Sequence, residues 1–358
     1  MLLTYIIYNS ILLFVGIFSF LVENAKSSSQ AWFSKSMVFF ILFIPAAIRY
    51  GIGTDYVNYA FVYKFPLFAE RLEIGYFYLQ KVLQNLNADV QWIFVITSFL
   101  IYLPICFFVP KKYYFLTLVF FVLTFYLPSY SMIRQAIAVS FIVVGVIQIV
   151  ENKNLYGIFV MALAATFHLS ALFVMPLVFL RFISFKTIYL LPLVILSSYL
   201  IVNLDFINIL FNSSLFLNSR YNVYATNKFS EIATINSGIG VMLRLILPFT
   251  VLFFQNRITK ENRNYRLYIV LTICYILAIV LALNIRIFGR LADLFSFISF
   301  LVVGPLIYSF PSKKNRQVLM IILIIVNIAV FQKNITANQR TFEGGGLGIS
   351  PYETIFKK

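Results

Sequence analysis

The sequence predicts an all-α protein, a polytopic integral membrane bundle of about 12 transmembrane segments, within a range of roughly 11–13. Hydrophobic residues make up 61% of the 358 residues and charged residues only 11%, a balance foreign to a water-soluble domain of this size. Apolar runs of about 20 residues, long enough at ~1.5 Å per residue to cross a ~30 Å hydrocarbon core, recur along the whole chain. These runs are continuously apolar and do not alternate, which argues against a transmembrane β-barrel.

The apolar runs also predict the individual spans, within one integral membrane domain covering residues 1–358. The first run lacks a basic start and a small-residue cleavage site, so we interpret it as a retained helix and not as a signal peptide. Residues 155–183 allow either one long helix or two short halves that turn near His168, and two short halves could also form a re-entrant hairpin. The expected spans are residues 3–22, 36–48, 91–109, 115–128, 133–150, 155–168, 169–183, 187–203, 238–255, 267–284, 291–310 and 318–331.

Short basic loops predict the orientation of these helices. Lysine and arginine accumulate in the short cytoplasmic loops of membrane proteins. We therefore expect the following connections in the cytoplasm: residues 24–35, 110–114, 151–154, 181–186, 256–266 and 311–317. The other connections then face outward, among them a long loop near 204–237. In a membrane protein the net charge of +16 mainly reflects this orientation and does not indicate nucleic-acid binding.

Residues 66–90 are too polar for a span and predict an amphipathic helix at the outer membrane surface. Apolar residues recur there at helical spacing, opposite a polar set. The apolar positions are Leu72, Tyr76, Leu79, Leu83 and Leu86, and the polar ones are Glu73, Gln80, Lys81 and Gln84.

Several ionisable residues fall at the predicted outer ends of the helices, where they are costly and commonly functional. In residues 49–59, RYGIGTDYVNY, two glycines permit tight bends that would bring Arg49 toward Asp55. Arg134 begins a helix whose first amide groups point toward the same space, an arrangement suited to an anion. His168 is the only histidine, and neutral imidazole can accept a proton near pH 7.

A second outward cluster lies on one predicted helical face. It consists of Arg286, Arg290 and Asp293, which are spaced by four and three residues. Two arginines then share one aspartate, so one positive charge is not neutralised within the cluster. All of these groups also have structural interpretations: Arg–Asp ion pairs, an arginine that reaches to the interface, or a packed histidine.

Four arginines together with aspartate and a histidine at one surface suit an anionic lipid headgroup, notably a diphosphate. No expected cytoplasmic loop is long enough for a nucleotide-binding domain, so a substrate must arrive activated and already in the membrane. Polyprenyl-diphosphate-linked sugars meet both conditions. Arginines would then stabilise the departing diphosphate, and His168 or Asp55 would take the acceptor proton. A lone histidine with few carboxylates does not suggest a metal site, so we expect no metal ion or other cofactor.

Five motifs occur in the order found in one known family. They are RYGIGTDYVNY at 49–59, EIGYFYLQKVL from Glu73, IRQAIAVSF around Arg134, LAATFHLSALFVMPL around His168, and SPYETIF at 350–356. In this order they resemble the EpsG-like branch of the Wzy-type polysaccharide polymerases. Residues 187–285 are similar only in hydropathy.

The resemblance implies a GT-C-like, metal-independent glycosyltransferase of the bacterial cytoplasmic (inner) membrane. It would join undecaprenyl-diphosphate-linked oligosaccharide repeat units on the outer face, with its active site facing the periplasm or exterior. The product would be O-antigen of lipopolysaccharide, capsule or exopolysaccharide, and a chain-length-determinant co-polymerase is an expected partner. The expected residues are His168 and Asp55 in catalysis, Arg49, Arg134, Arg286, Arg290, Tyr56 and Gln135 in diphosphate and substrate binding, and Glu73 and Asp293 in support.

Two other functions fit parts of the pattern. A flippase or transporter of lipid-linked sugars would line a path through both leaflets with basic residues. Here such residues gather on one side, and no inverted repeat is visible. An O-antigen ligase or a membrane acyltransferase would share the arginine and histidine chemistry.

Overall fold

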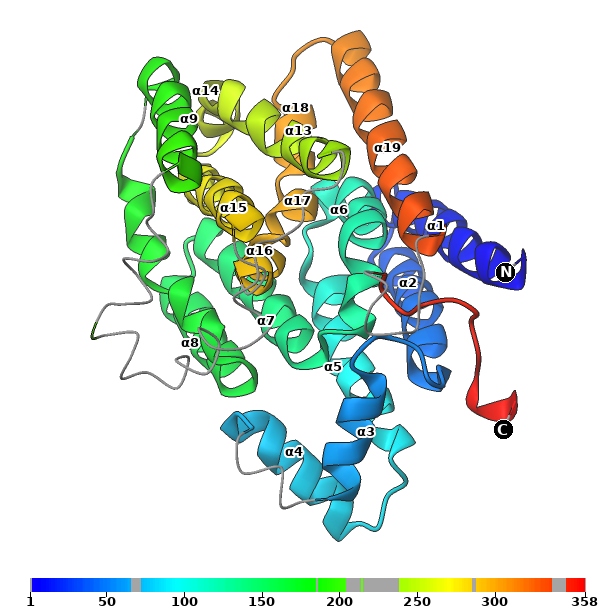
Figure 1. The fold of residues 1–358 in the computed structure, drawn as a ribbon. Helices are drawn as coiled ribbons and strands as arrows, with labels where there is room; N and C mark the ends of the chain where they lie inside the picture. Colours follow the sequence, from blue (N-terminus) through cyan, green and yellow to red (C-terminus); the bar gives the residue numbers. More distant parts are fainter. Residues whose placement is uncertain are drawn as a thin grey trace. The chain divides into compact units, whose positions relative to one another are not determined.

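The computed structural model describes residues 2–65, 72–184, 186–203, 214, 238–284, 288–336 and 346–357. All regular elements in these ranges are helical, and the only extended pairing is an isolated antiparallel bridge between Arg49 and Thr354 (Figure 1). This confirms the all-α prediction. The predicted outer loop near 204–237 and the predicted site residue Arg286 lie outside the described residues, apart from position 214.

Seven described helices are long and apolar enough to cross a membrane, which makes the chain a multi-pass membrane protein. Five are α1 (Leu2–Glu23), α2 (Ser28–Ile48), α5 (Gln91–Phe108), α7 (Ile133–Val150) and α19 (Lys313–Thr336). The sixth is Arg263–Leu283, which contains most of α15 (Arg266–Asn284). The seventh is Gly289–Tyr308, which contains α16 (Gly289–Phe295), α17 (Ile298–Leu301) and α18 (Val303–Tyr308). An eighth candidate is a pair bent by 61°, formed by α13 (Ile239–Phe253) and α14 (Gln255–Glu261).

The other predicted spans are helical but short. They are α6 (Tyr114–Phe121) with a π-helical turn at Val122–Tyr126, α8 (Asn154–Phe167), 3₁₀ turns at Leu169–Phe173 and Pro176–Phe182, and α9 (Thr187–Asn203). The predicted count of about 12 and the GT-C-like architecture therefore stay predictions. One continuous helix over 155–183 is ruled out, because the backbone at His168 is extended (φ −154°, ψ 115°) and ends α8 there. How many times these residues cross the membrane stays a prediction.

The chain divides into two compact units, residues 1–176 with 299–358, and residues 177–298. In the first unit α7 is the central helix, since 89% of its span is buried. A methyl group on Gly145 would lie 2.8 Å from the Gly157 carbonyl oxygen, and one on Gly157 would lie 2.7 Å from that of Gly145. Only glycine permits such an approach, so these two residues let α7 and α8 pack backbone to backbone.

One end of the first unit gathers three of the predicted cytoplasmic loops. Lys111 donates to the Ala25 carbonyl oxygen at 2.6 Å, and Glu23 accepts hydrogen bonds from the Phe115 amide and the Tyr308 hydroxyl. The loops after α1, before α6 and after α18 therefore share one end, as the basic pattern requires.

The other end is closed by an extended segment, residues 347–354, which we term the C-terminal strap. Its backbone bonds the loop after α2, since Tyr50 N donates to Glu353 O and Gly53 N to Gly348 O, both at 2.9 Å. Gly53 has a φ of 100°, and a methyl group there would lie 2.5 Å from the Tyr130 carbonyl oxygen, so this contact requires glycine.

Side chains of several elements hold the strap in place. The Tyr8 hydroxyl donates to Ile349 O at 3.0 Å, and the Tyr352 hydroxyl donates to Pro45 O at 2.8 Å. Ser131, three residues before Arg134, donates to Leu347 O at 3.2 Å and accepts from Thr54 N at 3.1 Å. The strap thereby joins α1, α2 and the segment that leads into α7.

Between α2 and α5 the chain forms a hairpin of two short helices, α3 (Tyr56–Lys64) and α4 (Ile74–Asn85) (Figure 1). The rings of Tyr59 and Tyr76 lie 6.0 Å apart, and Gln84 donates to the Tyr63 carbonyl oxygen at 2.7 Å. These contacts pack the inner faces of the two helices against each other.

A helix occupies Ile74–Asn85 of the region 66–90, and its burial agrees with the predicted apolar face at Tyr76 and Leu83 but not at two other positions, whereas its place at the outer membrane surface stays a prediction. Gln80, assigned to the polar face, is 1% exposed, whereas Leu86, assigned to the apolar face, is 72% exposed. The helix ends at Asn85, before Leu86, and its inner face is selected by contacts with α3 and α8, so the hydrophobic pattern alone does not determine it.

Candidate active site

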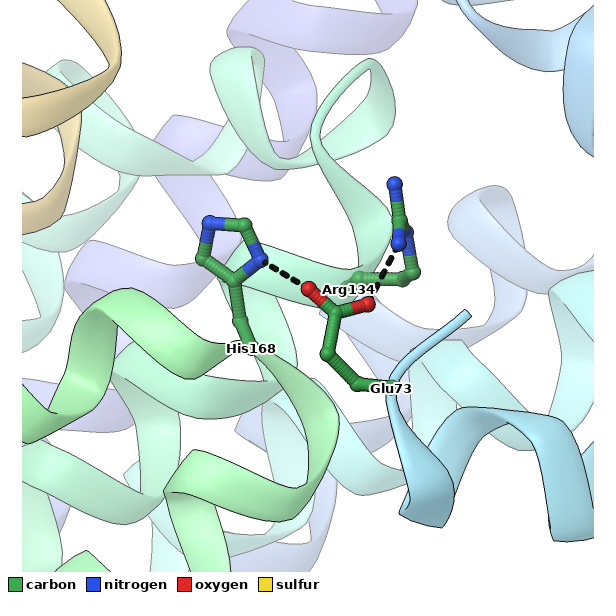
Figure 2. Close-up of polar contacts among 3 residues, drawn as sticks. All are labelled: Glu73, Arg134 and His168. Atoms are coloured by element: carbon green, nitrogen blue, oxygen red, sulfur yellow. Dashed lines mark hydrogen bonds and ion pairs between the residues drawn. The ribbon is translucent and has the colours of Figure 1, made fainter. Parts of the chain in front are cut away.

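Three side chains from separate parts of the first unit converge at the end that carries the strap (Figure 2). Glu73 lies at the start of α4, Arg134 is in the first turn of α7, and His168 follows α8. One carboxylate oxygen of Glu73 pairs with His168 Nδ1 at 3.1 Å, and the other forms an ion pair with Arg134. The side chains of Glu73, His168 and Arg134 are 12%, 17% and 24% exposed, so the cluster is partly open to the surroundings.

Local structure explains why these residues meet. Gly75 lies two residues after Glu73, and a methyl group on it would fall 2.6 Å from Thr166 Oγ1. Glycine therefore allows α4 to touch the end of α8, which carries Glu73 to His168. The extended backbone at His168 turns the chain out of α8, and its carbonyl oxygen accepts from Ala171 N at 3.0 Å.

The electrostatics keep Glu73 ionised. Burial opposes ionisation of its carboxyl group, but the hydrogen bond with His168 and the charge of Arg134 outweigh this, and the pKa of Glu73 falls to about 2. An ionised carboxylate only accepts hydrogen bonds, so a neutral His168 carries its hydrogen on Nδ1. Its Nε2 is then the basic atom, in the arrangement by which a carboxylate orients a histidine for general-base catalysis.

Tyrosines form the wall behind the ion pair. Burial raises the pKa of Tyr59, and the nearby Arg134 partly opposes this effect. Burial likewise raises the pKa of Tyr76, and the nearby Tyr59 adds to the increase. Both phenols stay neutral at physiological pH, so the negative charge next to Arg134 comes from Glu73.

Arg49 lies at the same end in a closed setting. It is 1% exposed, its guanidinium donates to the Tyr130 carbonyl oxygen at 3.3 Å, and it lies over the rings of Tyr130 and Phe94 at 4.4 and 5.4 Å. Tyr56, another predicted substrate-binding residue, is 6% exposed and stacks on Phe94 with ring centroids 4.1 Å apart. In this structure both residues belong to the packed wall of the unit.

The remaining predicted residues lie on other elements of the two units. Asp55 flanks the start of α3 and is half-buried, and Gln135 is buried in α7. Arg290 and Asp293 lie on α16 in the second unit, where Arg290 and Arg244 of α13 both act electrostatically on Asp293. Arg244 is not among the predicted residues, because it stands alone in the apolar run of α13 without a charged neighbour at helical spacing. Among the described residues, no three His, Cys, Asp or Glu side chains are grouped as metal ligands would be.

The fold and the site together define a class: a multi-pass helical membrane protein with an acid–base and cationic cluster at one end of its helices. The chain belongs to the EpsG family, whose model matches residues 32–354, and this is a family of Wzy-like polysaccharide polymerases. The resemblance inferred from the motifs is thereby confirmed. Comparisons with curated proteins and with solved structures yield no match.

Proposed function

We propose that this protein polymerises polyprenyl-diphosphate-linked oligosaccharide repeat units on the outer face of the bacterial cytoplasmic membrane. Undecaprenyl diphosphate is the expected lipid carrier. Membership of the EpsG family supports a polymerase, and the contact of His168 and Arg134 with one ionised carboxylate supports the site. That contact is the observation that carries the proposal.

The proposed reaction forms one glycosidic bond, breaks one bond to the diphosphate and transfers one proton. An acceptor sugar hydroxyl attacks the anomeric carbon of the donor, the bond between that carbon and the diphosphate oxygen breaks, and the hydroxyl proton passes to His168 Nε2. Glu73 holds the ring through Nδ1 and stabilises the imidazolium that forms. His168 then releases its proton to solvent.

Arg134 is the proposed partner of the departing diphosphate. Its guanidinium is the more exposed partner of the ion pair and lies at the amino terminus of α7, where the helix dipole also favours an anion. As negative charge grows on the leaving group, this cation stabilises it, and Glu73 limits the strength with which the diphosphate product is held. This role requires no metal ion.

Purified protein in proteoliposomes, supplied with lipid-linked repeat units, tests the proposal. A ladder of products longer than one unit is expected. Transfer to lipid A core instead would indicate a ligase, and movement of the lipid between leaflets without new bonds would indicate a flippase.

A pair of matched variants tests whether the cluster is responsible. Glu73→Gln should abolish the ladder, whereas Glu151→Gln, the same change at an exposed carboxylate in the loop between α7 and α8, should leave it intact. Equal activity of the two variants would remove Glu73 from the mechanism.

The proposed orientation has its own test. Single cysteines at Thr54 or Asn58, which are exposed near the cluster, should react with an impermeant thiol reagent added to whole cells or spheroplasts. Cysteines at Asn152 or Lys153 should not react until the membrane is opened. The reverse pattern would place the cluster on the cytoplasmic side and contradict the proposal.

A further inference from the structure

The hairpin of α3 and α4 exposes an apolar stripe on each helix. On α3 the exposed apolar residues are four positions apart, with Val57 73% and Phe61 43% exposed, and Phe65, which directly follows the helix at the same spacing, is 51% exposed. The same spacing continues on α4, where Ile74 is 61%, Tyr78 55% and Val82 57% exposed, and Leu86, which directly follows the helix, is 72% exposed. Residues four apart lie on one side of a helix, so each stripe is a continuous surface.

The charges within the two helices of the hairpin have one sign. Lys64 and Lys81 are exposed among the apolar side chains, and neither helix contains an acidic residue. Apolar side chains bordered by lysine are typical of helices that lie in the headgroup region of a membrane, where the lysine stems reach past the apolar surface to the phosphates.

Both ends of the hairpin are attached to candidate spans. Gln91, the first residue of α5, donates to the carbonyl oxygens of Ala47 at 2.6 Å and of Arg49 at 3.1 Å, so α2 ends where α5 begins. The strap fixes the loop between α2 and α3 at the same end. The hairpin therefore starts and finishes where two spans leave the hydrocarbon core.

We infer that the α3–α4 hairpin lies on the lipid surface, with its two apolar stripes inserted among the headgroups and upper acyl chains of the leaflet at that end. The occupant of the exposed stripes is lipid, because the surface continues directly from the membrane spans and both helices carry lysine and no acidic residue. Ile74 follows Glu73 directly, so insertion of α4 holds the candidate active site at the level of the lipid phosphates; this last consequence rests on the proposed function.

Nitroxide labels in lipid nanodiscs test the inference without relying on activity. The protein is reconstituted in phosphatidylethanolamine and phosphatidylglycerol, with Cys274→Ser and with the buried Cys106 kept. Single labels replace Phe61, Tyr78 or Val82. Collision rates are compared for oxygen, which concentrates in lipid, and for a water-soluble nickel chelate.

Two reference positions calibrate the measurement. Leu13, 61% exposed in the middle of α1, reports lipid, and Lys153, whose side chain is 60% exposed in a loop, reports water. Hairpin labels should give an oxygen-to-nickel ratio at least several-fold above that of Lys153 and toward that of Leu13. A ratio equal to that of Lys153 would overturn the inference.

Shielding from both reagents would also overturn it, because the stripes would then be covered by protein. Spin–spin broadening between labels would identify that protein as a second copy of this chain. Because polymerisation is not measured, insertion can fail while the proposed function holds, and the proposed function can fail while insertion is observed.

Discussion

Arg49 and Arg134 lie at the same end of the first unit, in surroundings of opposite kind. Arg49 is enclosed by aromatic rings and a backbone carbonyl and is 1% exposed. Arg134 faces a carboxylate that also binds a histidine, and its side chain is 24% exposed. An enclosed arginine contributes to the stability of the fold, whereas an arginine in an ion pair near solvent can exchange partners when an anion arrives. Substitutions at the two sites should therefore affect different measurements.

The largest expected effect on the polymerisation rate is at His168, in the partly exposed cluster that it forms with Glu73 and Arg134. His168→Ala and His168→Gln should each lower the polymerisation rate by about 10²–10⁴-fold, the usual cost of losing a general base. Glutamine preserves hydrogen bonding but is not basic, so both variants should accumulate single repeat units at a normal protein level. Full-length polymer from His168→Gln would show that the histidine only positions neighbours, and Asp55 would become the better candidate base.

Arg134→Lys should lower the rate by about 10-fold, because lysine keeps the charge but loses the planar fork that holds two oxygens. The protein should remain as stable as wild type, which distinguishes this site from that of Arg49. Arg263→Lys, at an exposed arginine just before α15, is the matched control. Wild-type rates in Arg134→Lys and also in Arg134→Ala would exclude a role in diphosphate binding.

Acid should reduce the stability that the cluster of Glu73, Arg134 and His168 provides before it affects the enclosed surroundings of Arg49. Glu73 has a lowered pKa of about 2 against an ordinary value of 4.5, so its contribution to stability is complete above pH 4.5 and is lost as the pH falls toward 2. Unfolding curves in detergent should show this loss in wild type and a smaller one in Glu73→Gln. Identical acid profiles would mean that the carboxylate does not stabilise the folded state.

In the enclosed region, Arg49→Lys should lower the free energy of unfolding by about 1–2 kcal/mol, because an ammonium group replaces the guanidinium stacked on the rings. The rate per folded molecule should stay near wild type. Thermal melting measured together with the initial rate separates the two effects. A large rate loss without a change in melting would place Arg49 in the active site after all.

The smallest effect should come from the strap. Tyr352→Phe removes the hydroxyl that donates to the Pro45 carbonyl oxygen and should cost about 1 kcal/mol of stability. Tyr78→Phe, at an exposed hairpin position, should cost less than Tyr352→Phe. Equal melting temperatures for the two variants would show that the strap bond contributes little.

Much of this architecture could be predicted from the sequence, because lipid imposes strict rules on the backbone. In the bilayer core every amide must be bonded within the chain, so long apolar runs become helices at the places where they occur. The turn at His168 was also predictable, since basic segments flank 155–183 on both sides. Segments such as α6 and α8 are apolar but short, and their hydropathy does not decide whether they cross.

The side-chain geometry of the site was less accessible. Glu73 was predicted only as a supporting residue, although it connects His168 and Arg134 across 95 and 61 residues of sequence. Such long-range pairs depend on how helices dock, and Gly75 beside Glu73 is the only local sign of that contact. Arg49 was predicted to bind substrate from its position at the outer end of a helix. Its enclosure by the rings of Phe94 and Tyr130 could not be predicted, because these residues are distant from it in sequence.

The strap has a consequence for the order in which the protein is made. The carbonyl oxygen of Ile349 accepts a hydrogen bond from the hydroxyl of Tyr8, which lies 341 residues earlier in the chain. The ribosome therefore completes every described membrane helix before the strap emerges. Until then Thr4 and the backbone of Tyr50 and Gly53 lack their partners from the strap. A nascent chain therefore inserts with this end unsealed, and the segment that leads to Arg134 is secured only after translation has passed residue 347. A nonsense mutation after the end of α19 and before residue 347 would keep the described membrane helices but remove the strap, so this end of the first unit would stay open.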